Sequence, residues 1–155
     1  MQLLTFHLGD ERYAINTRYI VEVVPLVKLT KIPLADPVVA GLLNLRGLPV
    51  PVIDLRMLVD QIPVRHLMST RLILIPLSIE SCQRLVAFTA ERVTEITQQN
   101  TLDTKSVGLN LDRAPFIQGV IFDDQGTIQV LDPLKVLNDY LKQALFTETN
   151  QVNTG

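Results

Sequence analysis

The chain has 155 residues, of which 47% are hydrophobic, and its 14 lysine and arginine residues nearly balance 16 aspartate and glutamate residues. A chain of this length folds as one ordinary domain and buries roughly 68–70% of the surface that its unfolded form exposes. Without a basic run, nucleic acid is not expected as a partner. No apolar stretch approaches the roughly 18 residues of a membrane span, so direct membrane insertion is not expected either.

The N-terminus and the cysteine content favour the cytoplasm as the location. Residues 1–8 alternate like a strand and carry neither a basic leader nor a small-residue cleavage site. The single cysteine, Cys82, cannot form an intramolecular disulfide, which fits a reducing compartment. We therefore expect a cytoplasmic protein.

Period-two alternation predicts that most of the chain is β. Residues 4–8 and 13–15 flank Gly9-Asp10, which is typical of a β-hairpin. Residues 20–29 are expected to continue in extended form, because their valines favour strands and Pro25 opposes a helix. Further strands are predicted over residues 72–77, 85–89, 92–97, 116–122 and 127–131.

Helices are predicted at two places. Asp132-Pro133 supplies a capping carboxylate and a proline suited to a first helical turn. Apolar residues then follow at spacings of three and four, at Leu134, Leu137, Leu141 and Leu145. This pattern predicts a C-terminal amphipathic helix, and a shorter turn is expected after Asp54. Residues 1–146 are expected to form the domain, and 147–155 a polar, frayed tail.

The two halves of the chain resemble each other. Residues 14–23 align with 87–96 without a gap, and residues 41–58 align with 119–136, matching Gly41 to Gly119 and Asp54 to Asp132. Two equivalent sets of about five short strands suggest two small closed sheets, because closure removes exposed edges. The seam between them would be apolar and a natural place for a partner to dock.

No catalytic or cofactor constellation is found. His7 and His66 have no second metal ligand at suitable spacing, and Cys82 has no partner histidine. Asp123-Asp124 fits a pair of solvated turn carboxylates better than an acid and base. The glycines match neither a dinucleotide-binding nor a P-loop motif. We therefore expect no enzyme activity, metal, nucleotide or other cofactor.

Residues 41–56 contain the most informative segment. They predict a strand, a tight loop at Arg46-Gly47, a second strand, and a helix start at Asp54. Pro49 and Pro51 have the same parity, so both missing N–H groups point to one side, and that strand edge cannot be fully paired.

A loop that presents Asn44 and Arg46 beside an incompletely paired strand fits a recognition surface. The alternative is an exposed hairpin tip at which Arg46 only adds solubility. The residues by themselves leave both interpretations open.

The pattern G-x-x-N-L-R-G-x-x-x-P-x-x-D-L-R over residues 41–56 resembles the signature of CheW-like domains, and every fixed position is present. Residues 6–15, 32–33, 116–120 and 130–132 also resemble this family. The resemblance implies a mainly β fold, with two five-stranded, SH3-like barrels around a shared apolar seam and a C-terminal α-helix. It also implies a free-standing, non-catalytic adaptor.

By this resemblance, the partners would be the cytoplasmic tip of methyl-accepting chemoreceptors and the regulatory domain of a CheA-type histidine kinase. The protein would then be recruited to membrane-associated receptor arrays. The resemblance implies that Glu22, Asn44 and Arg46 make the partner contacts. Gly41 and Gly47 would hold the backbone shape around them.

Pro51 and Asp54 are fixed positions of the same motif and are expected to be structural. The second half departs from the family pattern, because residues 86–93 lose a glycine and carry Glu91 where aspartate is usual. Two alternatives to a chemotaxis adaptor therefore stay open. One is a CheW-like adaptor of twitching motility or surface sensing, and the other is a small β-barrel ligand-binding protein.

Overall fold

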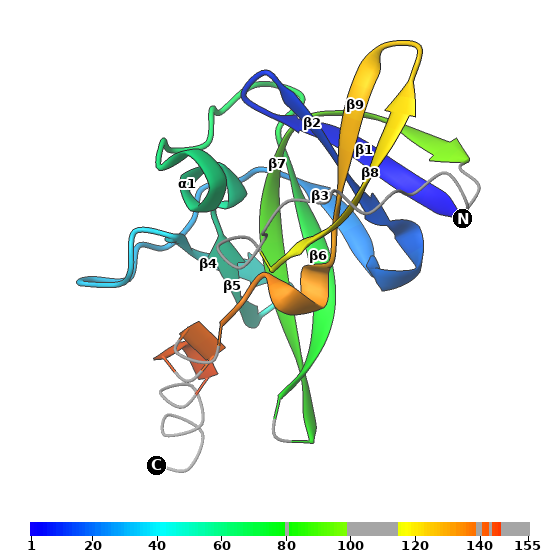
Figure 1. Ribbon diagram of the computed structural model, residues 1–155. Helices are drawn as coiled ribbons and strands as arrows, with labels where there is room; N and C mark the ends of the chain where they lie inside the picture. Colours follow the sequence, from blue (N-terminus) through cyan, green and yellow to red (C-terminus); the bar gives the residue numbers. More distant parts are fainter. Residues whose placement is uncertain (80, 99–114, 139–140, 143, 147–155) are drawn as a thin grey trace.

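The computed structural model describes residues 1–79, 81–98, 115–138, 141–142 and 144–146, and it has the predicted mainly β fold (Figure 1). The strands are β1 (Gln2–Leu8), β2 (Glu11–Asn16), β3 (Glu22–Pro25), β4 (Val39–Leu45), β5 (Leu48–Ile53), β6 (Arg71–Ile79), β7 (Cys82–Gln98), β8 (Ile117–Asp123) and β9 (Gly126–Leu131). The helical elements with defined bounds are η1 (Thr17–Tyr19), α1 (Leu55–Asp60) and η3 (Pro133–Lys135). No helix of the described residues is long and apolar enough to cross a membrane.

The long strand β7 joins two sets of strands. Its first part pairs with β6 and β5, and its last part pairs with β1. The strands predicted over 85–89 and 92–97 are therefore one continuous strand, which passes from one sheet to the other beside Arg92, whose φ is 48°. One set contains β3, β6, β7, β5 and β4, and the other contains β7, β1, β2, β9 and β8.

The two sets have the five strands expected of each, but among the described residues neither closes into a complete barrel. In the first set, only four residues of the extended segment predicted over 20–29 form strand β3. The chain after it is tied to β4 by a single bridge between Thr30 and Leu42. Pro25 and Pro33 lack N–H groups and so cannot extend the ladder there.

The predicted internal repeat is present in the strand pairing. Val52 of β5 lies beside Ala87 of β7 in parallel, and Val130 of β9 lies beside Ala14 of β2 in the same way. The β4–β5 hairpin of the first half thus pairs with β7, which the alignment assigns to the second half. The β8–β9 hairpin of the second half pairs with β2, which belongs to the first half. The exchange joins the two halves through backbone hydrogen bonds as well as through the core.

The matched residues also have matched local geometry. The register of the β4–β5 hairpin shifts at Gly41, and that of the β8–β9 hairpin shifts at Gly119. The backbone N–H groups of Asp54 and Asp132 each donate, at 2.7 Å, to the carbonyl of the residue that precedes the hairpin. Both aspartates then cap the following helical turn, as predicted.

The largest hydrophobic cluster lies between the two sheets and draws on both halves. Its fully buried members include Phe6 and Ile15 from the first half, Phe88 from β7, and Leu131 from β9. Burying one such side chain contributes about 1.5–3 kcal/mol. The cluster corresponds to the predicted apolar seam, and smaller clusters fill each sheet separately.

The C-terminal helix begins later than predicted. Asp132 caps only the short turn η3, and the next α-helical residues are 141–142 and 144–146. The side chain of Asn138 accepts a hydrogen bond from the N–H of Leu141 at 2.8 Å and so starts a new helical segment. The predicted polar tail, residues 147–155, lies outside the described residues.

Candidate functional site

The tip of the β4–β5 hairpin has an unusual backbone. Arg46 and Gly47 both have positive φ values, 50° and 89°, as a two-residue hairpin loop of the type I′ kind requires. The side-chain oxygen of Asn44 accepts a hydrogen bond from the N–H of Gly47 at 2.8 Å, which fixes the loop. A left-handed conformation costs about 1–2 kcal/mol for a residue with a Cβ atom. Arg46 therefore occupies a position that its own backbone disfavours.

The guanidinium of Arg46 forms an ion pair with Glu22. The Nη2–Oε2 distance is 3.2 Å, and the two side chains are 72% and 38% exposed. An exposed pair of this kind contributes about 0–1 kcal/mol to stability. The pair joins β3 to a hairpin with which β3 shares no strand pairing, and both charges are accessible to a partner.

Apolar side chains lie next to these charges. Val21 and Val23, on either side of Glu22 in sequence, are 58% and 39% exposed, and Leu48 beside the hairpin tip is half-exposed. The candidate site is therefore a charged pair with an apolar border. This composition suits a protein interface better than a small-molecule pocket, because no polar groups converge into a cavity there.

The other predicted site residues form the framework of the hairpin. Gly41 has a φ of 149°, and a Cβ atom built there would lie 2.6 Å from the carbonyl oxygen of Thr30. Pro51 is buried and lies opposite Leu42. At Gly47 a Cβ atom would meet nothing within 4 Å, so the positive φ is its only requirement.

Asp54 makes two hydrogen bonds that shape the end of the hairpin. One carboxylate oxygen accepts from the N–H of Met57, which caps α1, and the other accepts from the N–H of Val64, both at 3.0 Å. The side chain thus holds both the helix and the segment after it. Like Gly41 and Pro51, Asp54 is buried and stabilises the backbone of the site instead of forming part of its accessible surface.

A buried carboxylate on strand β7, that of Glu91, was not among the predicted site residues. Glu91 is completely buried and accepts hydrogen bonds from the N–H groups of Gly9 at 3.0 Å and Arg65 at 2.8 Å. Its oxygens also pair with the guanidinium groups of Arg65 at 3.1 Å and Arg56 at 3.4 Å. Burial alone raises the pKa of Glu91, but the hydrogen bonds from Arg65 and Gly9 outweigh it, so the pKa lies below its ordinary value.

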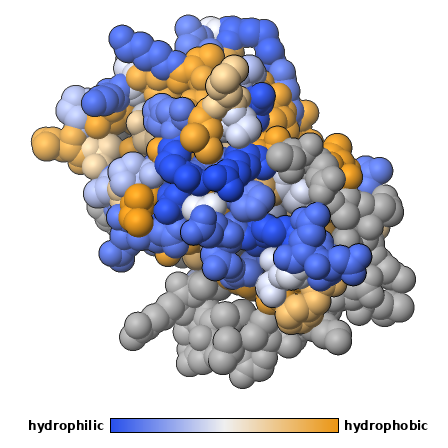
Figure 2. Space-filling view, turned by 90° about the horizontal axis from the view of Figure 1, so that it is seen from above, coloured by the Kyte–Doolittle hydropathy of each residue, from blue (hydrophilic) through white to orange (hydrophobic). Residues whose placement is uncertain are grey.

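This Glu91 cluster joins the β1–β2 turn, α1 and the segment after α1 to strand β7. The only signals for it in the sequence were Arg56 in the motif and the unusual glutamate at position 91. Nothing in the sequence indicates that these residues, far apart along the chain, share one carboxylate. The carboxylate itself is buried, and on the surface Figure 2 shows hydrophilic residues gathered at the centre of the face that is seen from above.

The structure offers no metal centre within its described residues, since no three histidine, cysteine or acidic side chains gather there. Asp123 lies exposed at the turn of the β8–β9 hairpin, as expected, but it is also paired. It forms two hydrogen bonds with the guanidinium of Arg12, at 2.7 and 2.8 Å, and these lower its pKa to about 2. This carboxylate is a structural anchor of the β8–β9 hairpin.

Comparison with known proteins gives the family. A family model described as "CheW-like domain" matches residues 2–141. The chain belongs to the CheW-like family. Among relatives of this family, "Chemotaxis protein CheW" of Bacillus subtilis is 22% identical over 143 residues, covering 92% of this chain and 90% of the relative. "Probable chemotaxis protein CheW" of Rhizobium etli is 24% identical over 151 residues, covering 96% and 88%.

The CheW-like fold is also found in a solved structure. The scaffolding protein TtCheW from Thermoanaerobacter tengcongensis superposes with a TM-score of 0.78 at 22% identity, covering 90% of this chain and 89% of that one. At this identity the likeness concerns the fold.

Proposed function

We propose that the chain is a non-catalytic adaptor of chemotaxis signalling. It joins the cytoplasmic tip of a methyl-accepting chemoreceptor to the regulatory domain of a CheA-type histidine kinase. The proposal rests chiefly on one observation, the accessible Arg46–Glu22 pair on a hairpin tip that Asn44 holds in shape. Membership of the CheW-like family and its chemotaxis relatives supports it.

The Arg46–Glu22 pair suits a charged docking contact. Because the intramolecular pair contributes little to stability, a partner carboxylate can replace Glu22 with little loss, and a planar guanidinium can hold a carboxylate through two hydrogen bonds. Glu22 then becomes available to a partner cation. The apolar border of Val21 and Val23 would exclude water from both contacts.

The Glu91 cluster suits an adaptor that acts by placement. It ties α1 and the β1–β2 turn to the strand that runs through both sheets, so partners bound to the two halves are held in a fixed relation. The adaptor transmits a conformational bias between them through this rigid connection. In this proposal residues 1–146 act as one domain, which the receptor recruits to arrays at the membrane.

A reconstitution tests this function. Vesicles carrying a chemoreceptor, a CheA-type kinase and the chain are mixed, and both kinase sedimentation and autophosphorylation are measured. We expect the kinase to sediment with the vesicles only when the chain is present, and Arg46→Ala to reduce this coupling. Asp124→Ala, at the matched tip of the other half, is the control. Equal sedimentation with and without the chain would refute the adaptor role.

A further inference from the structure

The two halves differ in how far their exchanged hairpins are paired. Strand β9 pairs with β2 over four residues, from Arg12–Ile128 to Ile15–Leu131. Strand β5 pairs with β7 over only two, Val52 with Ala87 and Ile53 with Phe88. Among the described residues, the first half therefore leaves a stretch of β7 without a paired strand on the side of β5.

Two prolines account for this difference. Pro49 and Pro51 occupy the positions that match Thr127 and Gln129 of β9 in the repeat. Neither proline has an N–H group to donate to a neighbouring strand. Pro51 matches Gln129, which pairs with Tyr13 in the ladder between β2 and β9. The ladder between β5 and β7 therefore ends at the position where the ladder between β2 and β9 continues.

The unpaired part of β7 presents both donors and acceptors. Backbone groups of successive residues in a strand point alternately to its two neighbours. The groups of Gln83 and Leu85 point the same way as those of Ala87, towards β5, whereas those of Arg84 point to β6. Among the described residues, nothing donates to or accepts from Gln83 or Leu85 on that side.

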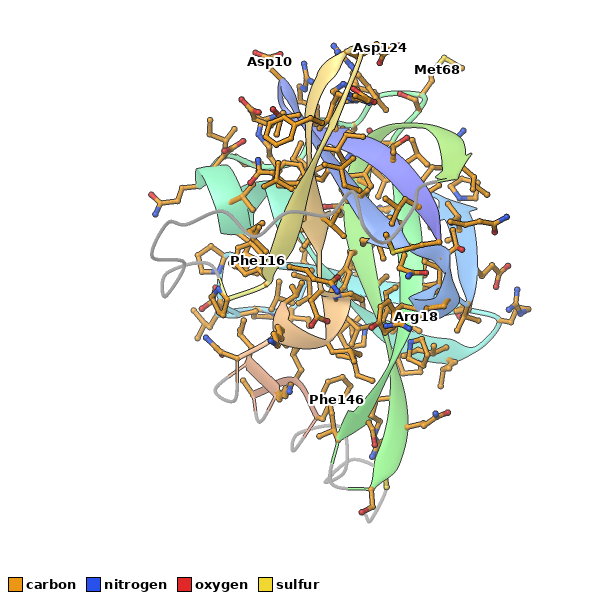
Figure 3. All side chains as sticks on the ribbon, turned by 45° about the vertical axis from the view of Figure 1, so that its right-hand side comes forward. Asp10, Arg18, Met68, Phe116, Asp124 and Phe146 are labelled. Carbon is orange, nitrogen blue, oxygen red and sulfur yellow. The ribbon has the colours of Figure 1, made fainter. Side chains whose placement is uncertain are left out.

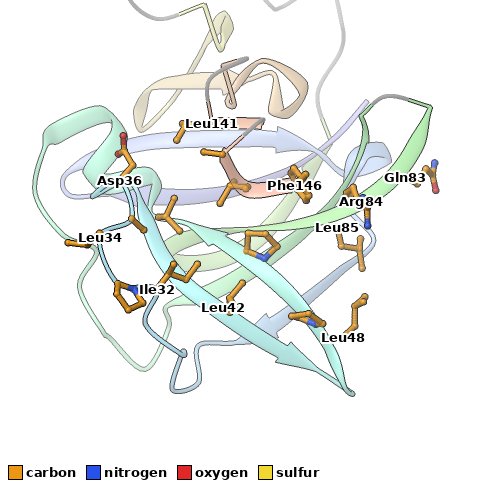
Figure 4. A pocket seen from close by; sticks show the side chains of 17 residues that line it. Ile32, Leu34, Asp36, Leu42, Leu48, Gln83, Arg84, Leu85, Leu141 and Phe146 are labelled. Atoms are coloured by element: carbon orange, nitrogen blue, oxygen red, sulfur yellow. The ribbon is translucent and has the colours of Figure 1, made fainter. Parts of the chain in front are cut away.

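An apolar groove of about 710 Å³ lies along this edge (Figure 4). One wall contains Leu42, Leu48, Pro49, Pro51 and Leu85, and another contains Leu141, Leu145 and Phe146. The volume falls within the range of about 300–1,000 Å³ that is usual for binding pockets. Figure 4 places two charged lining residues, Asp36 and Arg84, at opposite sides of the groove.

We propose that this groove binds an extended segment of a partner protein, which adds to β7 as a strand. The N–H and C=O groups of Gln83 and Leu85 pair with its backbone, as in other cases of strand addition. Since both walls are apolar, the segment carries a short run of apolar residues. Charge complementarity places a basic residue of the segment next to Asp36. This groove does not include Arg46 or Glu22, meets their apolar border at Leu48, and does not rest on the proposed function.

The other occupants fit less well. Two copies of the chain that paired edge to edge through Gln83 and Leu85 would bring the two Arg84 side chains together, and like charges on neighbouring strands repel. Residues 147–155 are polar and contain one large aliphatic residue, Val152, so they lack the apolar run. A separate protein segment satisfies the backbone, the walls and the charges together.

The test uses capped octapeptides with a central Val-Ile-Val-Ile run, flanked by aspartate at one end and lysine at the other, in both orders. Binding is followed by amide chemical shifts and hydrogen exchange of the full chain. In the free protein, the amides of Gln83 and Leu85 should exchange at least tenfold faster than those of Arg84 and Val86. One peptide order should slow the Gln83 and Leu85 amides at least tenfold.

Controls separate strand addition from apolar contact. Methylating alternate peptide nitrogens should weaken binding at least tenfold, and so should Gln83→Pro, which removes a donor that faces the groove and leaves the β6 ladder intact. Gln83→Ala should bind like the unchanged chain. The proposal is wrong if no peptide alters these amides at millimolar concentration, if they become protected as the chain itself is concentrated, or if removing residues 147–155 exposes them.

Discussion

The β4–β5 and β8–β9 hairpins share one framework and differ at their tips. Both have a two-residue loop, a register shift at a glycine and an aspartate that caps the next helical turn. The tip of one carries Arg46, and the matched position of the other carries Asp124. Since the same framework accepts either charge, the fold does not require a cation at Arg46. The difference between the tips is where partner specificity can reside.

A second difference lies deeper in the molecule. Glu91 is buried among arginines, whereas the matched residue of the first half, Arg18, lies on the surface and stacks on Tyr19. Figure 3 places Asp10, Asp124 and Met68 at one end of the molecule and Phe146 at the other. The halves thus share their strands, but only one of the two matched positions holds a buried polar cluster.

The largest effect is expected from Glu91→Gln. The variant removes the anionic acceptor of the Arg65 backbone N–H and leaves the mostly buried guanidinium of Arg56 with Asp60 as its remaining ion-pair partner. Removing one member of a buried ion pair costs about 3–5 kcal/mol. Urea unfolding measures the loss. Arg18→Ala, at the matched position, should change the free energy of unfolding by less than about 1 kcal/mol. Equal losses for the two variants would contradict the asymmetry.

The two capping aspartates should differ in a graded way. Asp132→Ala removes one cap bond and should cost about 1 kcal/mol. Asp54→Ala also leaves the buried N–H of Val64 without its acceptor, which adds about 1–3 kcal/mol. Thermal unfolding of both variants measures the difference. If Asp132→Ala were the more damaging, the account of the Asp54 site would be wrong.

Stability should fall in acid as Glu91 and Asp123 become protonated. The pKa of Glu91 lies below its ordinary value of 4.5, and that of Asp123 is lowered from 3.8 to about 2 by Arg12. Both carboxylates therefore stabilise the fold fully above about pH 5, and this stabilisation is lost as the pH falls through their folded-state pKa values. Melting temperature measured from pH 7 to 2 should fall in the wild type. In Arg12→Ala, the melting temperature should fall less between about pH 4 and 2 than in the wild type, because Asp123 has lost the partner that lowers its pKa.

Much of the fold could be predicted because the chain repeats its own pattern. Gly41 and Gly119, and Asp54 and Asp132, occupy matched positions in the alignment and matched geometry in the structure. Period-two alternation found the strands but could not show that residues 85–89 and 92–97 are one strand, because the bend beside Arg92 interrupts the alternation.

The rest depended on contacts between distant parts of the chain. The pattern of leucines indicated a helix from Pro133, but it could not show that Asn138 would start a separate segment. The Glu91 cluster joins Gly9, Arg56 and Arg65, whose spacing in sequence carries no signal. Glu22 and Arg46 were both selected, and the structure shows that they pair with each other.

The smallest effect on stability is expected at Arg46. Arg46→Asn loses an exposed ion pair, about 0–1 kcal/mol, but asparagine tolerates the left-handed conformation better than arginine. The melting temperature should therefore stay the same or rise slightly. Differential scanning calorimetry measures it, with Asp124→Asn as the matched control. A large loss of stability would show that Arg46 serves the fold and not a partner.

Binding by the same two variants tests the central claim most directly. Affinity for a receptor-tip fragment and for the regulatory domain of a CheA-type kinase is measured by calorimetry for the wild type, Arg46→Asn and Asp124→Asn. If Arg46 holds a partner carboxylate through two hydrogen bonds, Arg46→Asn should weaken binding to at least one partner by roughly 2 kcal/mol, about thirtyfold. Asp124→Asn should leave that affinity unchanged. Unchanged affinity of Arg46→Asn for both partners would contradict the account.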